Sequence, residues 1–598
     1  MIEPLPLRDF GLKNIPAVPL LLTFSEPLLT LFHLARRSLE VEPAKNGLSN
    51  TYTIGGQTAS GCDFLFGRSS AEELARATRE LERIVNMGPD GIRGAIFRGH
   101  AATPNGTTSG DTALTALSLD KPEDFSISWT NYENVYQDAQ PMLGKFAATL
   151  TSLDAADAEF WPMIANCGTA YNLIILEAVT NSRRDSLRPI FGELWTEHQL
   201  DTVQSEGRLY AIDLSLFGYL RPQVVDGVER FTPATITLLE QDAATKQLKP
   251  IAVRVASGQQ SQMYSRSRTP GAWLYALQAA KTSITVYGIW LGHVYHWHIV
   301  TAAMQMTMAN TLAADHPISL ASLPQSNYLI GFNEVLLLLW EYIAPPTSIA
   351  SPLQFLELCD RFAQGREYFE DDPRVTLSKA GLDAALFTKD KPWDSYPVVQ
   401  HLLTIWDDTA AFVEVFVDTT YVDDEAVALD TQLQSWMKAS ADPTAGNIRG
   451  LPEMKSKAAL KAVLTSFLYR ITAHGIARLN NSANPALTFT ANFPPCLQDS
   501  RLPAPQEKVD TKSLLKFLPK TGIIGKMVNF YFTFVFSPPY EPFIPANGVE
   551  SDLFFPTGLG DPRNAALVMR RKKLISFIEQ QYEPRHPQVS QWPMSIET

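Results

Sequence analysis

Apolar residues with helical spacing dominate this chain, and one stretch of them has no charged residue at all. From Thr282 to Ala314 there is no Asp, Glu, Lys or Arg. A helix that is apolar on every side is buried, either inside a protein or in a membrane. The stretch is long enough to span a bilayer. It is the only such run, however, and it contains three histidines, Gln305 and Asn310. We therefore expect an internal helix and no transmembrane segment.

Other segments show the spacing of amphipathic helices, with capping residues at their ends. We predict helices over Ser69–Gly88, Ala155–Val179, Pro352–Phe369, Asp407–Trp436 with a break near Asp423, and Ala565–Tyr582. The last of these includes the basic run Arg570–Lys573, which we interpret as a solvated helix face. A further apolar helix, KAVLTSFLYRITAHGIA, carries His474.

The segment Gly207–Val255 has a different pattern. GRLYAIDL, TPATITLLE and KPIAVRVA alternate polar and apolar residues and are rich in β-branched residues, which predicts a small antiparallel sheet. Thr490–Asp510 is rich in proline and resembles a loop. With no repeats and no linker, the sequence predicts one mainly α domain over residues 1–598, with a small β insertion at about 207–255.

Composition narrows the class of protein. The chain has 598 residues, of which 45% are hydrophobic and 19% are charged, as in a soluble globular protein. Its net charge of −13 argues against a nucleic-acid partner. The N-terminus MIEPLPLRDFGLKNIP lacks the features of a signal peptide, and the four cysteines are sparse and scattered. We therefore expect a cytoplasmic, reducing location.

The uncharged stretch contains GHVYHWHIV, with His293, His296 and His298. A single buried histidine is most simply a core residue bonded to a backbone carbonyl, but three within six residues favour a metal. His293 and His298 are five residues apart and share a face only if the helix adopts i→i+5 bonding, which is frequent at functional sites. His293 and His296 could share a face without that distortion. Together with His474 on the second apolar helix, either pair suggests a metal site between two buried helices.

Several motifs in the same order resemble those of one family. They are GRLYAIDL, TITLLEQDAATKQLKPIAVRVA, AWLYALQAAKTSITVYGIWLGHVYHWH, ADHPISLAS, YPVVQHLLTIWDDTAAFVEVFV followed by DTQLQSW, and the ending WPMSIET. They resemble the lipoxygenase catalytic domain from about Ser182 onward. The Pro-rich and then helical N-terminus resembles that of the compact fungal and bacterial members, without the N-terminal β-barrel of plant and animal members.

The resemblance implies a non-haem iron, or less often manganese, bound by His293, His298, His474 and the main-chain carboxylate of Thr598. Imidazole and carboxylate ligands suit a redox-active first-row metal. The implied substrates are O2 and a polyunsaturated fatty acid, and the product is a hydroperoxide, an oxylipin. The segments that line the family's substrate channel contain Phe332, Leu336, Leu402, Trp406 and Phe412 here.

The chain departs from the family at the metal. The weak fifth ligand, four residues after the third histidine, is replaced by Arg478, which has no lone pair to give a metal. Arg478 would turn away to a carboxylate, or anchor an anionic substrate or the C-terminus. Asn480 and Asn481 are the nearest substitutes for the lost ligand. Thr598 stands where the family ends in Ile, and Gln305 where Glu is usual.

Three functions remain after this comparison. The first is a fatty-acid dioxygenase of lipoxygenase type. The second is a diverged tailoring enzyme of natural product biosynthesis that rearranges, epoxidises or cyclises a polyene, polyketide or terpenoid. The third is a lipid-binding relative without turnover, which the intact histidines disfavour.

Overall fold

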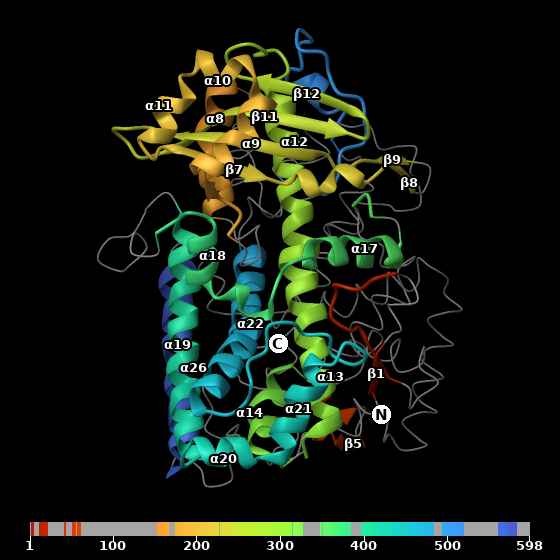
Figure 1. Ribbon diagram of the computed structural model, residues 1–598. Helices are drawn as coiled ribbons and strands as arrows, with labels where there is room; N and C mark the ends of the chain where they lie inside the picture. Colours follow the sequence, from red (N-terminus) through yellow and green to blue (C-terminus); the bar gives the residue numbers. More distant parts are fainter. Residues whose placement is uncertain are drawn as a thin grey trace.

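A computed structural model describes a helical body with a β-sheet at one end (Figure 1). It describes residues 2–4, 11–21, 41–43, 51–54, 57–60, 152–166, 174–225, 228–313, 315–326, 347–349, 351–383, 396–483, 493–518 and 560–582. The side chains of 2–4, 19–21, 41–43, 51–54, 57–60, 166, 225, 228, 297, 323–326, 352, 371, 474–483, 571, 575 and 577–582 are not described. The helix predicted from Ser69 lies outside these residues.

The principal α-helices are α8 (Leu153–Asn166), α9 (Asn181–Phe191), α10 (Glu193–Glu197), α11 (Leu200–Ser205), α12 (Trp273–Tyr287), α13 (Ala302–Thr311), α14 (Pro317–Ser326), α17 (Pro352–Ala363), α18 (Pro373–Lys379), α19 (Pro397–Thr420), α20 (Asp424–Leu429), α21 (Thr431–Ala441), α22 (Lys457–Ala483), α24 (Thr511–Leu514) and α26 (Pro562–Tyr582). The π-helix η7 covers Gly288–Thr301, and the 3₁₀ turns η6 and η8 cover Ser215–Tyr219 and Tyr368–Asp371. Short strand pairs outside the main sheet are β1 (Ile2–Pro4) with β2 (Pro19–Leu21), β3 (Val41–Pro43) and β5 (Gln57–Ser60) on either side of β4 (Thr51–Ile54), and β8 (Gln223–Val225) with β9 (Val228–Arg230).

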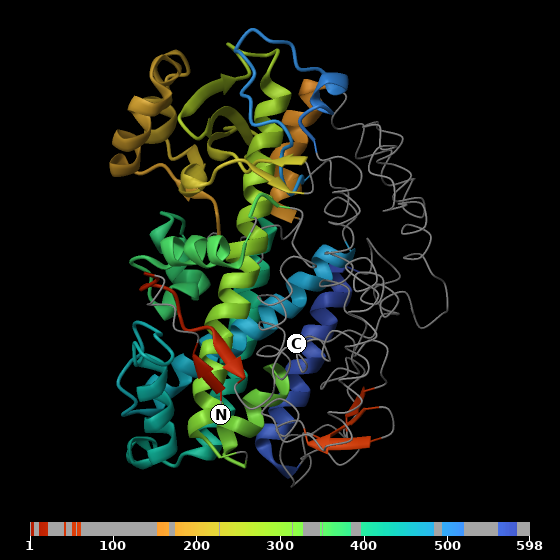
Figure 2. The same ribbon diagram turned by 90° about the vertical axis from the view of Figure 1, so that its right-hand side faces the viewer.

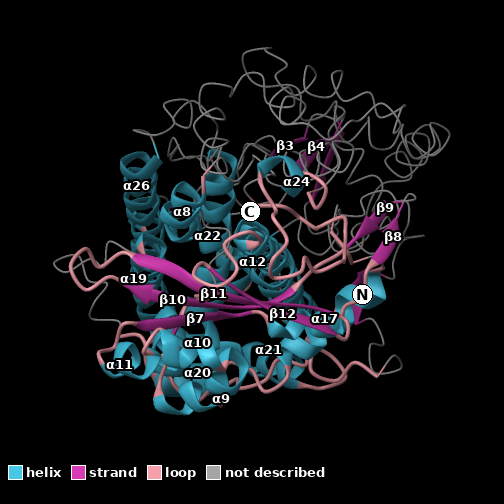
Figure 3. Ribbon diagram, turned by 90° about the horizontal axis from the view of Figure 1, so that it is seen from above, coloured by secondary structure: helices cyan, strands magenta, loops and turns pink. Residues whose placement is uncertain are grey.

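The main sheet is antiparallel and confirms the strands predicted within Gly207–Val255. Its order is β12 (Gln260–Ser265), β11 (Leu248–Ser257), β10 (Ala234–Gln241), β7 (Leu209–Asp213) and β6 (Glu177–Ala178). The register between β10 and β11 shifts after Leu238, next to Pro250, which has no N–H to give to a ladder. Both faces are covered, by α9–α11 on one side and by α8 and α12 on the other (Figure 3).

Residues 282–311 of the uncharged stretch lie within one continuous internal helix formed by α12, η7 and α13. It runs from the sheet to the far end of the molecule (Figure 1). Every side chain from Ala272 to Met308 whose exposure is described is buried. Lys281 carries the only formal charge in this segment. Because almost no charged group has to be solvated, neighbouring helices can surround the segment on all sides. None of the described helices combines the length and the hydropathy needed to cross a bilayer.

Three long helices, α19, α22 and α26, pack against one another beside this central helix (Figure 2). The predicted break near Asp423 is confirmed. The chain leaves α19 after Thr420, and the carboxylates of Asp423 and Asp430 cap α20 and α21 by accepting bonds from Ala426 N–H and Leu433 N–H.

Three sequence predictions need correction. The helix predicted over Ala155–Val179 ends at Asn166, and Glu177–Ala178 form a strand that pairs with β7. The helix predicted over Pro352–Phe369 ends at Ala363, before Gly365, which has a φ of 77°.

Arg570, predicted on a solvated face, is buried on α26. Its guanidinium donates to the hydroxyls of Thr472 and Thr409 and lies over the Phe412 ring, 5.4 Å from its centroid. Lys572 and Lys573 are exposed as predicted.

Gly446 contacts the N-terminal segment that contains Ala17. A Cβ at this position would lie 2.4 Å from the Ser440 carbonyl oxygen, and the Gly446 carbonyl accepts a bond from Ala17 N–H. We expect Gly446→Ala to lower the free energy of unfolding by about 1–2 kcal/mol through overpacking against backbone. Gly560→Ala is the matched control, because no atom of the described residues lies within 4 Å of its Cβ position. Urea denaturation of both variants measures the difference, and equal stabilities would contradict the expectation.

Candidate metal centre

The π-helix η7 brings His293 and His298 together on one face. Their Nε2 atoms are 3.3 Å apart, their ring centroids are 4.9 Å apart, and the ring planes meet at 84°. In a segment bonded from i to i+5, residues five apart stack on the same side. The hydroxyl of Thr301 follows the same spacing and donates to the His296 carbonyl five residues earlier. The predicted i→i+5 distortion is confirmed.

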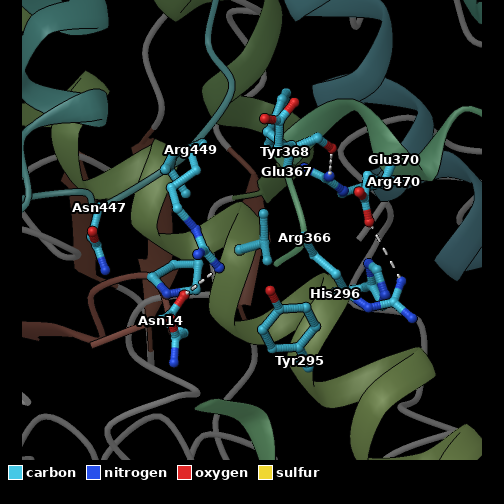
Figure 4. Close-up of a pocket in the computed structure, with 13 residues that line it drawn as sticks. Asn14, Tyr295, His296, Arg366, Glu367, Tyr368, Glu370, Asn447, Arg449 and Arg470 are labelled. Atoms are coloured by element: carbon cyan, nitrogen blue, oxygen red, sulfur yellow. Dashed lines mark hydrogen bonds and ion pairs between the residues drawn. The ribbon is translucent and has the colours of Figure 1, made fainter. Parts of the chain in front are cut away.

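His296 points away from this pair. Its ring lies edge-on to Phe362, with centroids 5.8 Å apart, and edge-on to Tyr295, with centroids 5.1 Å apart. It lines a separate polar cleft (Figure 4). Of the two pairings that the sequence left open, the structure forms the one between His293 and His298.

The predicted third histidine lies on a neighbouring helix. His474 is near the end of α22, and α22 packs against η7. Arg478, Asn480 and Asn481 follow on the same helix, and the structure does not describe these four side chains. Thr598, Phe332 and Leu336 lie outside the described residues. The roles assigned to these residues therefore stay predictions.

The end of the central helix is held by residues that the sequence did not identify as partners. His316 Nε2 lies 3.1 Å from Asp430 Oδ2, to which the Tyr421 hydroxyl also donates at 2.6 Å. Asp430 Oδ1 accepts from Leu433 N–H at 2.9 Å. Burial raises the pKa of Asp430, but the hydrogen bonds from Leu433, Tyr421 and His316 outweigh burial and hold that pKa below its usual value. The motifs ADHPISLAS and DTQLQSW thus meet at one carboxylate.

The second of these motifs also fixes the central helix itself. The indole N–H of Trp436, fully buried on α21, donates to the Met304 carbonyl on α13 at 3.1 Å. The hydroxyls of Thr307 and Ser440 join the same two helices at 2.7 Å. Helix α21 therefore fixes α13, which continues directly from the segment with the histidine pair.

Several known proteins are similar to this chain in sequence and in fold. Residues 390–527, which include α19 to α22, match the lipoxygenase family model. The chain is 22% identical over 318 residues to a human polyunsaturated fatty acid lipoxygenase, ALOX15B, covering 52% of this chain and 45% of that protein. It is 25% identical over 354 residues to a manganese lipoxygenase of Colletotrichum gloeosporioides, covering 54% of this chain and 52% of that protein.

A solved calcium-dependent 11R-lipoxygenase superposes with a TM-score of 0.65 at 14% identity, covering 94% of this chain and 77% of that structure. Together these matches support a lipoxygenase-family protein. Its mostly helical fold is that of the lipoxygenase catalytic domain. The matched region spans about half the length of the curated relatives.

The lipoxygenase metal can be tested against the histidine pair. Two nitrogens bound about 2.1 Å from one metal in adjacent positions lie about 3 Å apart, close to the observed 3.3 Å. Both rings are nearly buried, with 9% and 7% of their residues exposed. The described side chains alone do not bring three His, Cys, Asp or Glu residues together. The pair thus fits two adjacent ligands, and the other donors have to come from outside the described side chains.

The predicted channel residues that the structure describes lie on α19. Leu402 is buried, and Trp406 packs edge-on against Tyr469 of α22, with ring centroids 4.9 Å apart. Phe412 packs in parallel with Phe416 and lies under Arg570. Trp406 and Phe412 thus contact α22 or α26, which is the packing of ordinary core residues, and their place in a channel stays a prediction.

Proposed function

We propose that this chain is a metal-dependent dioxygenase of lipoxygenase type that converts a polyunsaturated fatty acid and O2 to a hydroperoxide. One C–H bond breaks at a doubly allylic carbon, one C–O bond forms, and the hydrogen ends in the hydroperoxide group. The observation that carries the proposal is the convergence of two buried imidazoles in a π-helix, in a chain of this family.

The residues have distinct parts in this proposal. A bound iron or manganese would supply the one-electron redox chemistry that C–H cleavage needs. His293 and His298 would hold it from η7, with His474 from α22 and the carboxylate of Thr598 completing the set. The π-helix fixes the relative orientation of the two described rings, and their burial keeps bulk water from competing for the site.

A second candidate is a tailoring enzyme on the same fold, acting on another polyene. Arg478 supports it, because a cation replaces the usual weak ligand one helical turn after His474. A permanently charged guanidinium near the metal would alter either the electronics of the site or the anion bound beside it.

Metal content and turnover separate these functions. We expect protein purified without added metal to contain about one iron or manganese per chain. We also expect linoleate to give a rising conjugated-diene absorbance, with one O2 consumed for each diene formed. Metal without linoleate turnover would favour the tailoring enzyme. Folded protein without metal would contradict both.

A further inference from the structure

A polar cleft lies beside the π-helix, on the side of His296. Three arginines line it from three separate segments (Figure 4). Arg366 follows α17, Arg449 precedes α22, and Arg470 is on α22. Tyr295 and His296 of η7 form part of another wall. We propose that this cleft binds a small organic carboxylate, at a site separate from the His293–His298 face.

The Arg366 guanidinium is available to a ligand. It lies 4.0 Å from the centroid of the Phe362 ring and 3.8 Å from Glu370 Oε2, which is too long for a hydrogen bond. Glu370 is instead held by Lys379 Nζ at 2.5 Å. Among the described residues, none accepts a hydrogen bond from this guanidinium, and its side chain is 39% exposed.

Arg449 is positioned and still has free donors. Its Nη2 donates to the carbonyls of Asn14 and Ala363, which fixes the side chain across the cleft. Within the described part of the chain, its Nε and Nη1 have no hydrogen-bond acceptor. A guanidinium held at one end by backbone carbonyls offers its other N–H groups at low entropic cost.

Arg470 supplies positive charge at the buried end of the cleft. Only 3% of this residue is exposed, its Nη2 donates to the Tyr368 carbonyl at 2.6 Å, and its guanidinium lies 4.0 Å from the centroid of the Tyr368 ring. In surroundings of low dielectric constant, this charge attracts an anion more strongly than an exposed arginine would.

The charge of the lining and the shape of its donors indicate the class of ligand. The described lining residues include three arginines and two glutamates, Glu367 and Glu370, and Glu370 is bound by Lys379, so positive charge is in excess. A carboxylate is attracted by this excess, and its two oxygens match the paired N–H groups of arginine. Val300 and Ile448 border the polar groups but are only 4% and 3% exposed, so the cleft offers room for no more than a short hydrocarbon chain.

Isothermal titration calorimetry on the full chain, with butyrate as the probe, tests this site. We expect saturable butyrate binding and at least about tenfold weaker binding of the uncharged isostere butyramide, with inorganic phosphate binding no more tightly than butyrate. Arg366→Gln and Arg449→Gln should each weaken butyrate binding about tenfold. Arg374→Gln is the matched control, because Arg374 pairs with Asp407 away from the cleft and should leave binding unchanged.

Each opposite outcome overturns the proposal. These are no butyrate binding, equal binding of butyramide, stronger binding of phosphate, or unchanged binding in both cleft variants. Arg449→Gln removes ties to two backbone carbonyls and can unfold the protein, whereas Arg366→Gln removes no hydrogen bond within the described structure. The assay measures binding without metal or turnover, so its failure is distinct from failure of the proposed dioxygenase.

Discussion

His298→Ala is expected to remove the bound metal and with it all oxygenation of linoleate. The substitution takes away one of two imidazoles whose Nε2 atoms converge at 3.3 Å. Loss of a direct ligand should lower metal affinity by roughly 100-fold or more, beyond the effect of changing a residue that only orients a ligand. Metal per chain, measured by mass spectrometry, and conjugated-diene formation should therefore fall together.

His296→Ala is the matched control for this experiment. The two histidines are two residues apart in the same π-helix and both are buried, but His296 faces Phe362 and the polar cleft. We expect His296→Ala to keep its metal. Full occupancy in His298→Ala, combined with loss in His296→Ala, would show that the other pairing binds the metal.

Asp430→Asn is expected to give the largest loss of stability among the variants considered. The aspartate accepts hydrogen bonds from Leu433 N–H and the buried Tyr421 hydroxyl and contacts His316. An amide has only one acceptor oxygen, so one of these groups would face an N–H₂ group. We expect the free energy of unfolding to fall by about 2–4 kcal/mol at pH 7. Chemical denaturation followed by circular dichroism measures it.

Acidification should remove this difference. The pKa of Asp430 is lowered in the folded protein, so its charge stabilises the fold above the unfolded pKa of about 3.9, and this contribution is lost as the pH falls through the folded pKa. The gap between wild type and Asp430→Asn should therefore narrow below about pH 4. Asp423→Asn is the control, because Asp423 makes one capping bond, which asparagine replaces well. A gap that persisted unchanged in acid would contradict the role of the charge.

The sequence predicted what depends on local spacing. The absence of charge from Thr282 to Ala314 was enough to predict an internal helix. The five-residue spacing of His293 and His298 indicated i→i+5 bonding as one of two alternatives, and the structure has it. Alternation within Gly207–Val255 predicted the strands, although not the pairing with Glu177–Ala178, because two residues are too few to show alternation.

Contacts between distant residues could not be predicted in this way. Arg366, Arg449 and Arg470 line one cleft, but over a hundred positions separate the first from the last, and each resembles an ordinary surface arginine in its own segment. Arg570 was misassigned because it belongs to a run of four basic residues, and the sequence does not show that this one points inward to Thr472. In both cases tertiary packing decides where the side chain lies, and the periodicity of one segment carries no information about its contacts with distant segments.

The π-helix also restricts how this protein can change. Removing one residue between Gly288 and Thr301 would turn everything beyond the deletion by roughly a quarter of a turn relative to everything before it. The indole of Trp436 would then no longer meet the Met304 carbonyl while the sheet end of the helix kept its place. An insertion or deletion in this segment should therefore disturb the packing of α13 together with the histidine pair, whereas a substitution keeps both in register.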